Sequence, residues 1–246
     1  MIVLFTDFGG NDIYVPQMKA ALLARDPSTV IIDLLHSVPD FRIEPAAHLL
    51  AALHDRFPVD TVFVAVVDPG VGTSRNAAIV RADGRWYVGP DNGLLSVIAA
   101  RAMSARAWHI SWRPPDLSAS FHGRDLFAPI AAAIAAGDFP IDKVDQVERL
   151  DVALDPGDLA QIIYIDHYGN AMTGLRGSAL PADATIGAGA SKVAHARVFD
   201  EVPAGTAFWY VNSIGLVEIA ANRANAAALL ALAIGDAVQC VARTQS

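Results

Sequence analysis

The stretch TVFVAVVDPGVGTSR, residues 61–75, begins with seven nearly all-apolar residues and then places Asp68 directly before a Pro-Gly turn. A strand that is apolar on both faces is typical of a sheet covered by helices on both sides, as in the parallel sheets of α/β proteins. Ending such a strand does not require a carboxylate. Asp68 is therefore a candidate functional residue at the end of a predicted buried strand.

The chain before residue 61 alternates strand-like and helix-like segments. Residues 2–5 (IVLF) and 30–35 (VIIDLL) predict two further buried strands. Apolar residues recur at helical spacing from Val15 to Leu22, and residues 44–57 predict a second helix. This alternation predicts an N-terminal α/β domain with a largely parallel central sheet.

After Arg75 the pattern changes. Residues 77–89 predict a hairpin that turns at Asp83-Gly84, and residues 125–137 predict an Ala-rich helix. A region rich in Pro and Asp then precedes several short β-like segments, among them residues 195–202, which predict a smaller C-terminal β-barrel-like domain. The predicted division is an N-terminal α/β domain (residues 1–145), a linker (146–157) and a C-terminal β domain (158–246).

The composition argues against several classes of protein. Of the 246 residues, 53% are hydrophobic and 18% are charged, which indicates a folded rather than a disordered chain. A net charge of -8 argues against nucleic-acid binding, because phosphate backbones are bound by basic surfaces. The chain has a single cysteine, opens on MIVLF without a basic leader, and has no apolar stretch near the ~20 residues of a membrane span. We therefore expect a cytoplasmic protein without a membrane partner.

Three ionisable residues, Asp7, His36 and Asp68, follow the three predicted strands. Ligands of open α/β sheets bind outside the carboxyl ends of the strands, where the loops converge. We therefore expect these side chains to lie at one rim and to contribute to a binding site. The alternative is that each Asp only caps the loop or helix that follows it.

Two further polar residues stand out. His122 lies between Phe121 and Gly123 just before the helix predicted over residues 125–137, and an imidazole there is a candidate for proton transfer. The alternative is a core histidine that is satisfied by its neighbours. Glu218 lies inside the apolar run GLVEIAA, where a buried carboxylate requires a partner.

Dinucleotide and metal sites are not predicted. The loop GVGTSR has Gly70 and Gly72 but lacks the third glycine and the following helix that would bind a pyrophosphate. The histidines have no HExxH spacing, and the chain has no CxxC pair.

Seven motifs in this order carry a resemblance to a known family: TDFGGNDIYVPQMK, DLLHSVP, VVDPGVGTSR, PDNGLL, SFHGRDLFAP, IDHYGNAMTG and NSIGLVEIA. Together they cover almost the whole chain, which resembles the S-adenosyl-L-methionine (SAM) hydroxide adenosyltransferases. These are SAM hydrolases related to fluorinase and chlorinase. The resemblance implies an N-terminal α/β domain, a C-terminal β-barrel-like domain and a homotrimer whose active sites lie between the N-domain of one subunit and the C-domain of the next. It implies SAM as the substrate and no cofactor or metal.

The resemblance also implies roles for individual residues. Asp68, Arg75 and His122 are similar to the family's Asp-Arg-His set, which positions and activates the water that attacks ribose C5′ and releases adenosine and L-methionine. Asp7 is similar to the carboxylate that binds the ribose hydroxyls, and Phe41 to an aromatic residue near the sugar. The other implied substrate contacts lie in the C-terminal half: Asp166, Asn170 and Ser213 toward methionine or adenosine, Glu218, Ala221 and Arg223 toward the purine, and Tyr168 and Phe199 as stacking partners of adenine.

Two departures favour a hydrolase over a halogenase. The halogenases carry an uncharged residue, typically tyrosine, where this chain has Asp68, and a carboxylate repels a halide. The fluorinase also has a serine where Gly123 stands. A chlorinase-like halogenase is therefore the first alternative, and a non-catalytic SAM- or adenosine-binding protein is the second. The second would need Asp7, Asn170 and Ser213 but not the Asp-Arg-His set.

Overall fold

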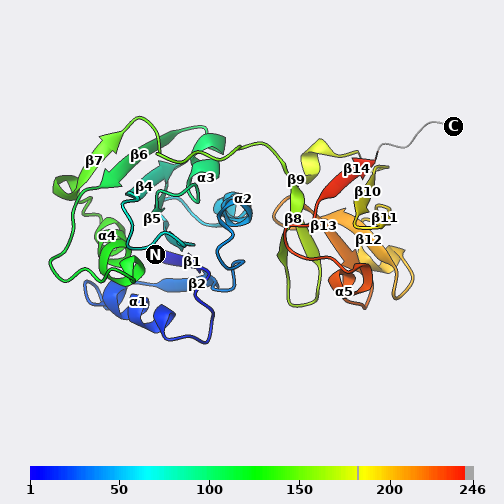
Figure 1. The fold of residues 1–246 in the computed structure, drawn as a ribbon, viewed down its shortest axis with the longest axis horizontal. Helices are drawn as coiled ribbons and strands as arrows, with labels where there is room; N and C mark the ends of the chain where they lie inside the picture. Colours follow the sequence, from blue (N-terminus) through cyan, green and yellow to red (C-terminus); the bar gives the residue numbers. More distant parts are fainter. Residues whose placement is uncertain (182, 242–246) are drawn as a thin grey trace. The chain divides into compact units, whose positions relative to one another are not determined.

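The computed structural model describes residues 1–181 and 183–241, without the side chains of residues 179 and 241. The chain forms two compact units, Met1–Pro156 and Gly157–Ser246 (Figure 1). Each unit has its own apolar core. Among the residues described, every helix is too short or too polar to span a bilayer.

The first unit is built around one mixed sheet of seven strands in the order β2-β1-β3-β5-β4-β6-β7. Its strands are β1 (Ile2–Thr6), β2 (Ile31–Leu35), β3 (Val62–Val66), β4 (Ala77–Ala82), β5 (Arg85–Pro90), β6 (Ala105–Ile110) and β7 (Val144–Val147). The strands β2, β1, β3 and β5 pair in parallel, whereas β4, β6 and β7 add antiparallel pairs. The parallel arrangement predicted for the first three strands and the hairpin at Asp83-Gly84 are therefore confirmed.

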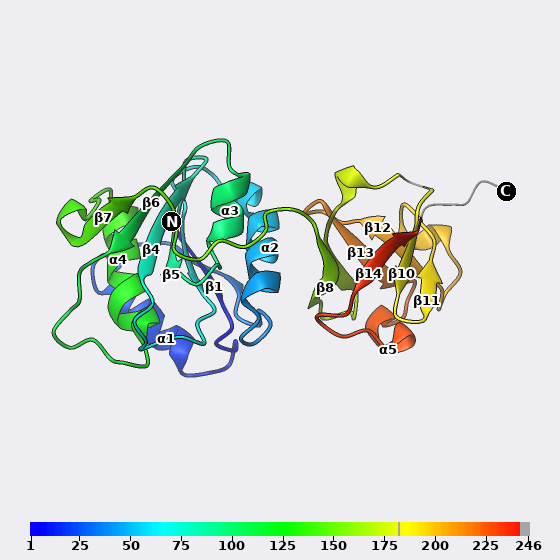
Figure 2. The same cartoon turned by 45° about the horizontal axis from the view of Figure 1, so that its top comes forward.

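Helices cover both faces of this sheet. They are α1 (Tyr14–Leu23), α2 (Ile43–Leu53), α3 (Ser96–Arg101) and α4 (Ala128–Ala135), with the short 3₁₀ helices η1 (His54–Arg56) and η3 (Ile141–Lys143) and the π-helical turn η2 (Gly123–Phe127). Figure 2 shows α1 and α4 on one face, and α2 and α3 on the other. Every residue of β1 and β3 is buried. This explains why both strands are apolar without alternation.

The second unit contains two antiparallel sheets, β12-β13-β9-β8 and β11-β10-β14. Its elements are β8 (Leu159–Ile165), β9 (Ala171–Arg176), η4 (Gly177–Ala179), β10 (Thr185–Ala188), β11 (Ser191–Val193), η5 (Phe199–Glu201), β12 (Ala207–Val211), β13 (Leu216–Ala221), α5 (Ala226–Leu230) and β14 (Val238–Val241). Isolated bridges, Gln161 to Ala237 and His195 to Trp209, join the edges of the two sheets. The described residues form no closed sheet, so the predicted barrel-like domain is not confirmed. The predicted β-segment at residues 195–202 is wrong at η5, which is a 3₁₀ helix.

The parallel pairing of β1 with β3 positions the first pair of predicted site residues. Thr6 lies opposite Val66 in the register of these two strands. Asp7 follows β1 directly and Asp68 follows β3 after one intervening residue. The two carboxylates therefore leave the sheet at the same edge, at the carboxyl ends of adjacent strands.

Candidate functional site

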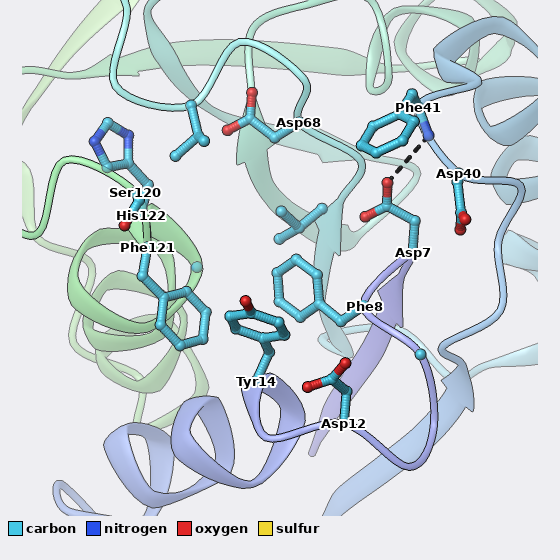
Figure 3. Close-up of a pocket in the computed structure, with 14 residues that line it drawn as sticks. Asp7, Phe8, Asp12, Tyr14, Asp40, Phe41, Asp68, Ser120, Phe121 and His122 are labelled. Carbon is cyan, nitrogen blue, oxygen red and sulfur yellow. Dashed lines mark hydrogen bonds between the residues drawn. The ribbon is translucent and has the colours of Figure 1, made fainter.

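A cavity of about 560 Å³ opens at this edge of the first unit. Four predicted site residues line it: Asp7, Phe41, Asp68 and His122. Figure 3 shows the carboxylates of Asp7 and Asp68 with the ring of Phe41 at one side of the cavity, and the rings of Phe8, Tyr14 and Phe121 at the other. The sequence prediction that Asp7 and Asp68 meet at one rim is confirmed.

Arg75 binds Asp68 through two hydrogen bonds. Its Nε donates to Asp68 Oδ1 at 2.7 Å, and its Nη2 donates to Asp68 Oδ2. The side chains of Asp68 and Arg75 are only 5% and 10% exposed. The two groups form a bidentate ion pair, in which two guanidinium N–H groups bind the two carboxylate oxygens. This geometry fixes the orientation of both side chains.

His122 completes a continuous set with this ion pair. Nη2 of Arg75 lies 3.1 Å from Nδ1 of His122. Because a guanidinium only donates, Nδ1 must accept, and a neutral ring then carries its proton on Nε2. Burial lowers the pKa of His122, and the positive charge of Arg75 lowers it further, against the opposing effect of Asp68. The neutral imidazole therefore offers an N–H donor rather than a free lone pair on its second nitrogen.

Asp7 is held from one side by the backbone of Phe41. The Phe41 N–H donates to Asp7 Oδ2 at 3.3 Å, and Phe41 has a φ of 61°, in the left-handed region. A bulky residue with positive φ is strained, and such strain is concentrated at functional sites. Burial raises the pKa of Asp7, the Phe41 hydrogen bond lowers it, and the charges of Asp40 and Asp68 raise it.

The aromatic side of the cavity was not singled out in the sequence. The rings of Phe8, Tyr14 and Phe121 pack against one another with centroids 5.4–5.9 Å apart. A Cβ atom added at Gly123 would lie 3.3 Å from Phe8 and 3.4 Å from Phe121, so these rings fill the space beside that glycine. The motif TDFGGNDIY contains Phe8 and Tyr14 and was the available signal for them.

The same cavity is acidic as well as aromatic. Asp12 and Asp40 line it together with Asp7 and Asp68, and neither was predicted as a site residue. The guanidinium of Arg75 is paired with Asp68, and that of Arg124, which lies over the ring of Phe121, is paired with Asp125. A cavity with this set of charges favours a cationic ligand over an anionic one.

A second cavity, of about 520 Å³, lies in the second unit. Five predicted site residues line it: Tyr168, Asn170, Phe199, Ala221 and Arg223. Tyr168 and Phe199 are 74% and 38% exposed, so both rings offer faces for stacking. Asp166 holds two of these lining residues in place, because its carboxylate accepts hydrogen bonds from the backbone N–H groups of Tyr168 and Asn170 and from Asn170 Nδ2.

Family models match both units. The N-terminal domain model of the SAM hydroxide adenosyltransferases matches residues 2–145, and the C-terminal domain model matches residues 160–239. The chain belongs to this family. The motif resemblance found in the sequence is therefore confirmed.

The chain is similar to curated proteins that include SAM hydrolases and fluorinases. The (R)-S-adenosyl-L-methionine hydrolases of Thermus thermophilus and Salinispora arenicola are each 38% identical, over 97% and 96% of this chain and 98% and 96% of their own lengths. The fluorinase of Actinopolyspora mzabensis is 27% identical over 92% of both chains. The crystal structure of an uncharacterized conserved protein from Thermotoga maritima matches with a TM-score of 0.87 and 32% identity, over 98% of this chain and 99% of that one.

Glu218 and Ser213, like Asp166, are predicted contacts that are not among the residues lining the second cavity. Glu218 is 2% exposed in β13, and its carboxylate accepts hydrogen bonds from Tyr210 Oη at 2.6 Å and Asn212 Nδ2 at 2.8 Å. The partner that a buried carboxylate requires is therefore present. Ser213 is exposed in the turn between β12 and β13.

His36 follows β2 at the same edge of the sheet as Asp7, but it does not line the cavity. It is 9% exposed, its Nδ1 lies 2.8 Å from Thr6 Oγ1, and its Nε2 lies 3.0 Å from Asp33 Oδ1. The three ionisable residues therefore follow neighbouring strands at one edge as expected, but of the three only Asp7 and Asp68 line the cavity. The His36 network joins the end of β1 to β2, a contact between neighbouring strands.

Among the described residues, Asp91, His109 and Asp151 place three potential metal-ligand atoms within 4.8 Å of one another. Hydrogen bonds account for this cluster without an ion. His109 Nε2 lies 2.8 Å from Asp91 Oδ2, and that oxygen also accepts the backbone N–H of Asp151 at 2.9 Å. The cluster is therefore a structural contact.

Proposed function

We propose that the protein hydrolyses S-adenosyl-L-methionine to adenosine and L-methionine. The observation that carries this proposal is the continuous contact of Asp68, Arg75 and His122 at the edge of an acidic and aromatic cavity. A non-catalytic binding protein would not need this set. The names of the related hydrolases specify the R form of SAM, and we propose the same form as the substrate of this chain.

The reaction is a displacement at ribose C5′. A bond forms from the water oxygen to C5′ as the C5′–S bond breaks, and the electron pair stays on sulfur. The sulfonium leaves as the neutral thioether of methionine, so the leaving group needs no acid. The attacking water loses one proton, which finally reaches solvent, with His122 as the relay when its Nδ1 is free.

The chain's residues orient this water. Asp68 accepts a hydrogen bond from it with lone pairs that Arg75 does not occupy, and Arg75 stabilises the hydroxide character that develops. His122 donates from Nε2 in the resting geometry. It takes the water proton on Nδ1 only when the contact with Arg75 opens. Asp7 binds the ribose hydroxyls, and Tyr168 and Phe199 stack on adenine, with Asn170, Ala221 and Arg223 beside it.

The charge of Asp68 also separates this function from the halogenase alternative. A carboxylate beside the attacking water repels a chloride or fluoride ion that would take the place of that water. The reaction needs no cofactor, because the sulfonium is already activated. The cytoplasmic location expected from a chain with one cysteine stays a prediction, which cell fractionation checks.

The test is direct. Purified protein is incubated with each of the two sulfonium epimers of SAM, with and without chloride, and the products are separated by chromatography. We expect adenosine and methionine from the R epimer and no 5′-chloro-5′-deoxyadenosine. EDTA should leave the rate unchanged. Binding of SAM without product would indicate a binding protein instead.

We further propose a homotrimer in which the first unit of one protomer and the second unit of a neighbour supply the two halves of each site. The support is that predicted site residues line one cavity in each unit. The experiment co-expresses two variants, Asp68→Ala and Asn170→Ala, each of which we expect to have strongly reduced activity alone. Random mixing across subunits restores about a quarter of the sites, whereas sites within one protomer restore none. Light scattering measures the oligomeric state separately.

A further inference from the structure

The loop of residues 67–76 carries both Asp68 and Arg75, and a neighbouring turn holds the beginning of this loop. The side-chain amide of Asn92 donates to the carbonyl of Val67 at 2.9 Å. Val67 is fully buried and directly precedes Asp68. Without this donor, its carbonyl would lose a partner in a region that water does not reach.

The same turn holds the other end of the loop. The backbone N–H of Asp91 donates to the carbonyl of Asn76 at 2.9 Å, and this carbonyl also accepts from Arg75 Nη1 at 3.0 Å. The turn at Asp91 and Asn92 therefore fixes the backbone on both sides of the ion pair. Residues of the motif PDNGLL, which has no role in the proposed chemistry, make both contacts.

The last residues of the first unit brace this turn. The carboxylate of Asp91, 0% exposed, accepts the backbone N–H groups of Asp151 at 2.9 Å and Val152 at 3.4 Å. Asn76 Nδ2 donates to Asp151 Oδ2 at 2.8 Å. Residues 151 and 152 are thus bonded both to Asp91 in the turn and, through Asp151, to Asn76 at the end of the loop.

Gly93 allows the close approach of this segment. Its φ is +102°, which side chains rarely adopt, and an added Cβ would lie 3.0 Å from Leu154 Cγ and 3.3 Å from Val152 Cγ1. Nearby, Ser96 Oγ accepts the backbone N–H of Leu154 at 3.0 Å. Residues 151–154 therefore form a continuous brace along the turn.

We infer that Asp91, Asn92 and Asn76 are positioning residues for Asp68 and Arg75. Asn92 and Asp91 hold the two ends of loop 67–76, and Asn76 bonds its last residue to Asp151 in the brace of residues 151–154. The kinetic test of this inference rests on the proposed function, because Asp68 and Arg75 are the groups proposed to orient the attacking water.

The kinetic test uses Asn92→Ala and Asp91→Ala in the full chain. We expect each to lower kcat about 10-fold, since small misplacements of reacting groups are costly, while KM and the affinity for adenosine stay within about 2-fold. Asp91→Asn, which keeps one acceptor oxygen, should retain more activity than Asp91→Ala. If Asp91→Ala does not fold, the half-buried Asn92 still provides the comparison.

Asp83→Ala is the matched control. The Asp83 carboxylate also accepts two backbone N–H groups from a later segment, at 3.2 Å from Met103 and 3.0 Å from Ser104, but it lies at the β4–β5 turn, away from loop 67–76. We expect it to lower Tm and leave kcat unchanged. An equal loss of kcat in this control, or wild-type kcat in both Asn92→Ala and Asp91→Ala, would overturn the inference.

A spectroscopic readout separates this inference from the proposed function. The Nε–H of Arg75, which is bonded to Asp68, should exchange slowly with solvent in the nitrogen NMR spectrum, and Arg75→Lys assigns the signal. We expect faster exchange in Asn92→Ala but not in Asp83→Ala. If the wild type releases no adenosine, the proposed function fails and this measurement still decides the positioning role.

Discussion

Arg75 contacts His122 and Asp68 at the same time: its Nη2 lies 3.1 Å from Nδ1 of His122, and its Nε donates to Asp68 Oδ1 at 2.7 Å. This arrangement requires a neutral imidazole, because a protonated ring would have no acceptor for the guanidinium. The lowered pKa of His122, caused by burial and then by Arg75, agrees with this requirement. The charge state of one histidine thus controls the geometry of the whole set.

Activity should therefore decrease at low pH. Protonation of His122 puts a second positive charge against Arg75, and we expect kcat to fall with a midpoint below the ordinary value of about 6.5 for histidine. The measurement is the pH profile of kcat in the wild type and in His122→Gln, which keeps an acceptor but does not titrate. A midpoint at or above 6.5, or the same profile in the variant, contradicts this prediction.

The same shift makes a prediction about stability. The pKa of His122 is lower in the folded chain than in the unfolded chain, so the unfolded chain binds the proton first as pH falls. The free energy of unfolding should decrease from about pH 6.5 down to the folded pKa and lose nothing further from this group below it. Urea unfolding between pH 7.5 and 5 checks this. The wild type should lose more stability over that range than His122→Gln.

Replacement of Asp68 should separate chemistry from binding. We expect Asp68→Ala to lower kcat roughly 10²-fold, the scale of lost acid–base or orienting help, with SAM binding largely retained. His122→Ala should behave similarly. Single-turnover kinetics and calorimetric titration with SAM measure the two quantities. Wild-type rates in both variants would remove this set from the mechanism.

Asp7 is expected to act in binding. Asp7→Ala removes the carboxylate that faces the ribose position, and we expect weaker affinity for adenosine, by about 10-fold for a lost hydrogen bond to a charged group. Asp12→Ala, in the same cavity, is the comparison for a general loss of negative charge. Calorimetry with neutral adenosine distinguishes the two. Unchanged affinity in Asp7→Ala would mean that the ribose assignment is wrong.

Gly169 should not tolerate a side chain. Its φ is +85°, and an added Cβ would lie 2.1 Å from Cγ of Asn225, the residue whose Oδ1 caps α5 through the N–H of Ala228. We expect Gly169→Ala to lower the free energy of unfolding by about 1–3 kcal/mol through backbone strain and the displaced cap. Chemical unfolding measures this loss. Gly205→Ala has a similar φ of +79° in open space and should show the strain alone.

Part of the site could be predicted because it depends on local sequence. The apolar segments of β1 and β3 identify two buried strands, and parallel neighbouring strands bring the residues after their carboxyl ends to one edge of the sheet. Asp7 and Asp68 therefore meet as expected. His36 also follows a strand at this edge, but its side chain is bonded to Thr6 and Asp33 and does not line the cavity.

Other relationships depend on contacts between residues far apart in the chain. The need of Glu218 for a partner was visible in its apolar surroundings, but its cross-strand neighbour Tyr210 follows only from the register of β12 with β13. Nothing in the spacing of the chain links Gly169 to Asn225.

The amino-acid sequence by itself determined the α/β character of the first unit, its family and the residue types of the reactive set, because these follow from apolar periodicity and ordered motifs. Only the tertiary structure decided which nitrogen of His122 meets Arg75 and that residues 151–154 brace the turn behind loop 67–76. Hydrogen-bond direction and partner choice depend on distances of a few ångströms, which the folded backbone alone sets.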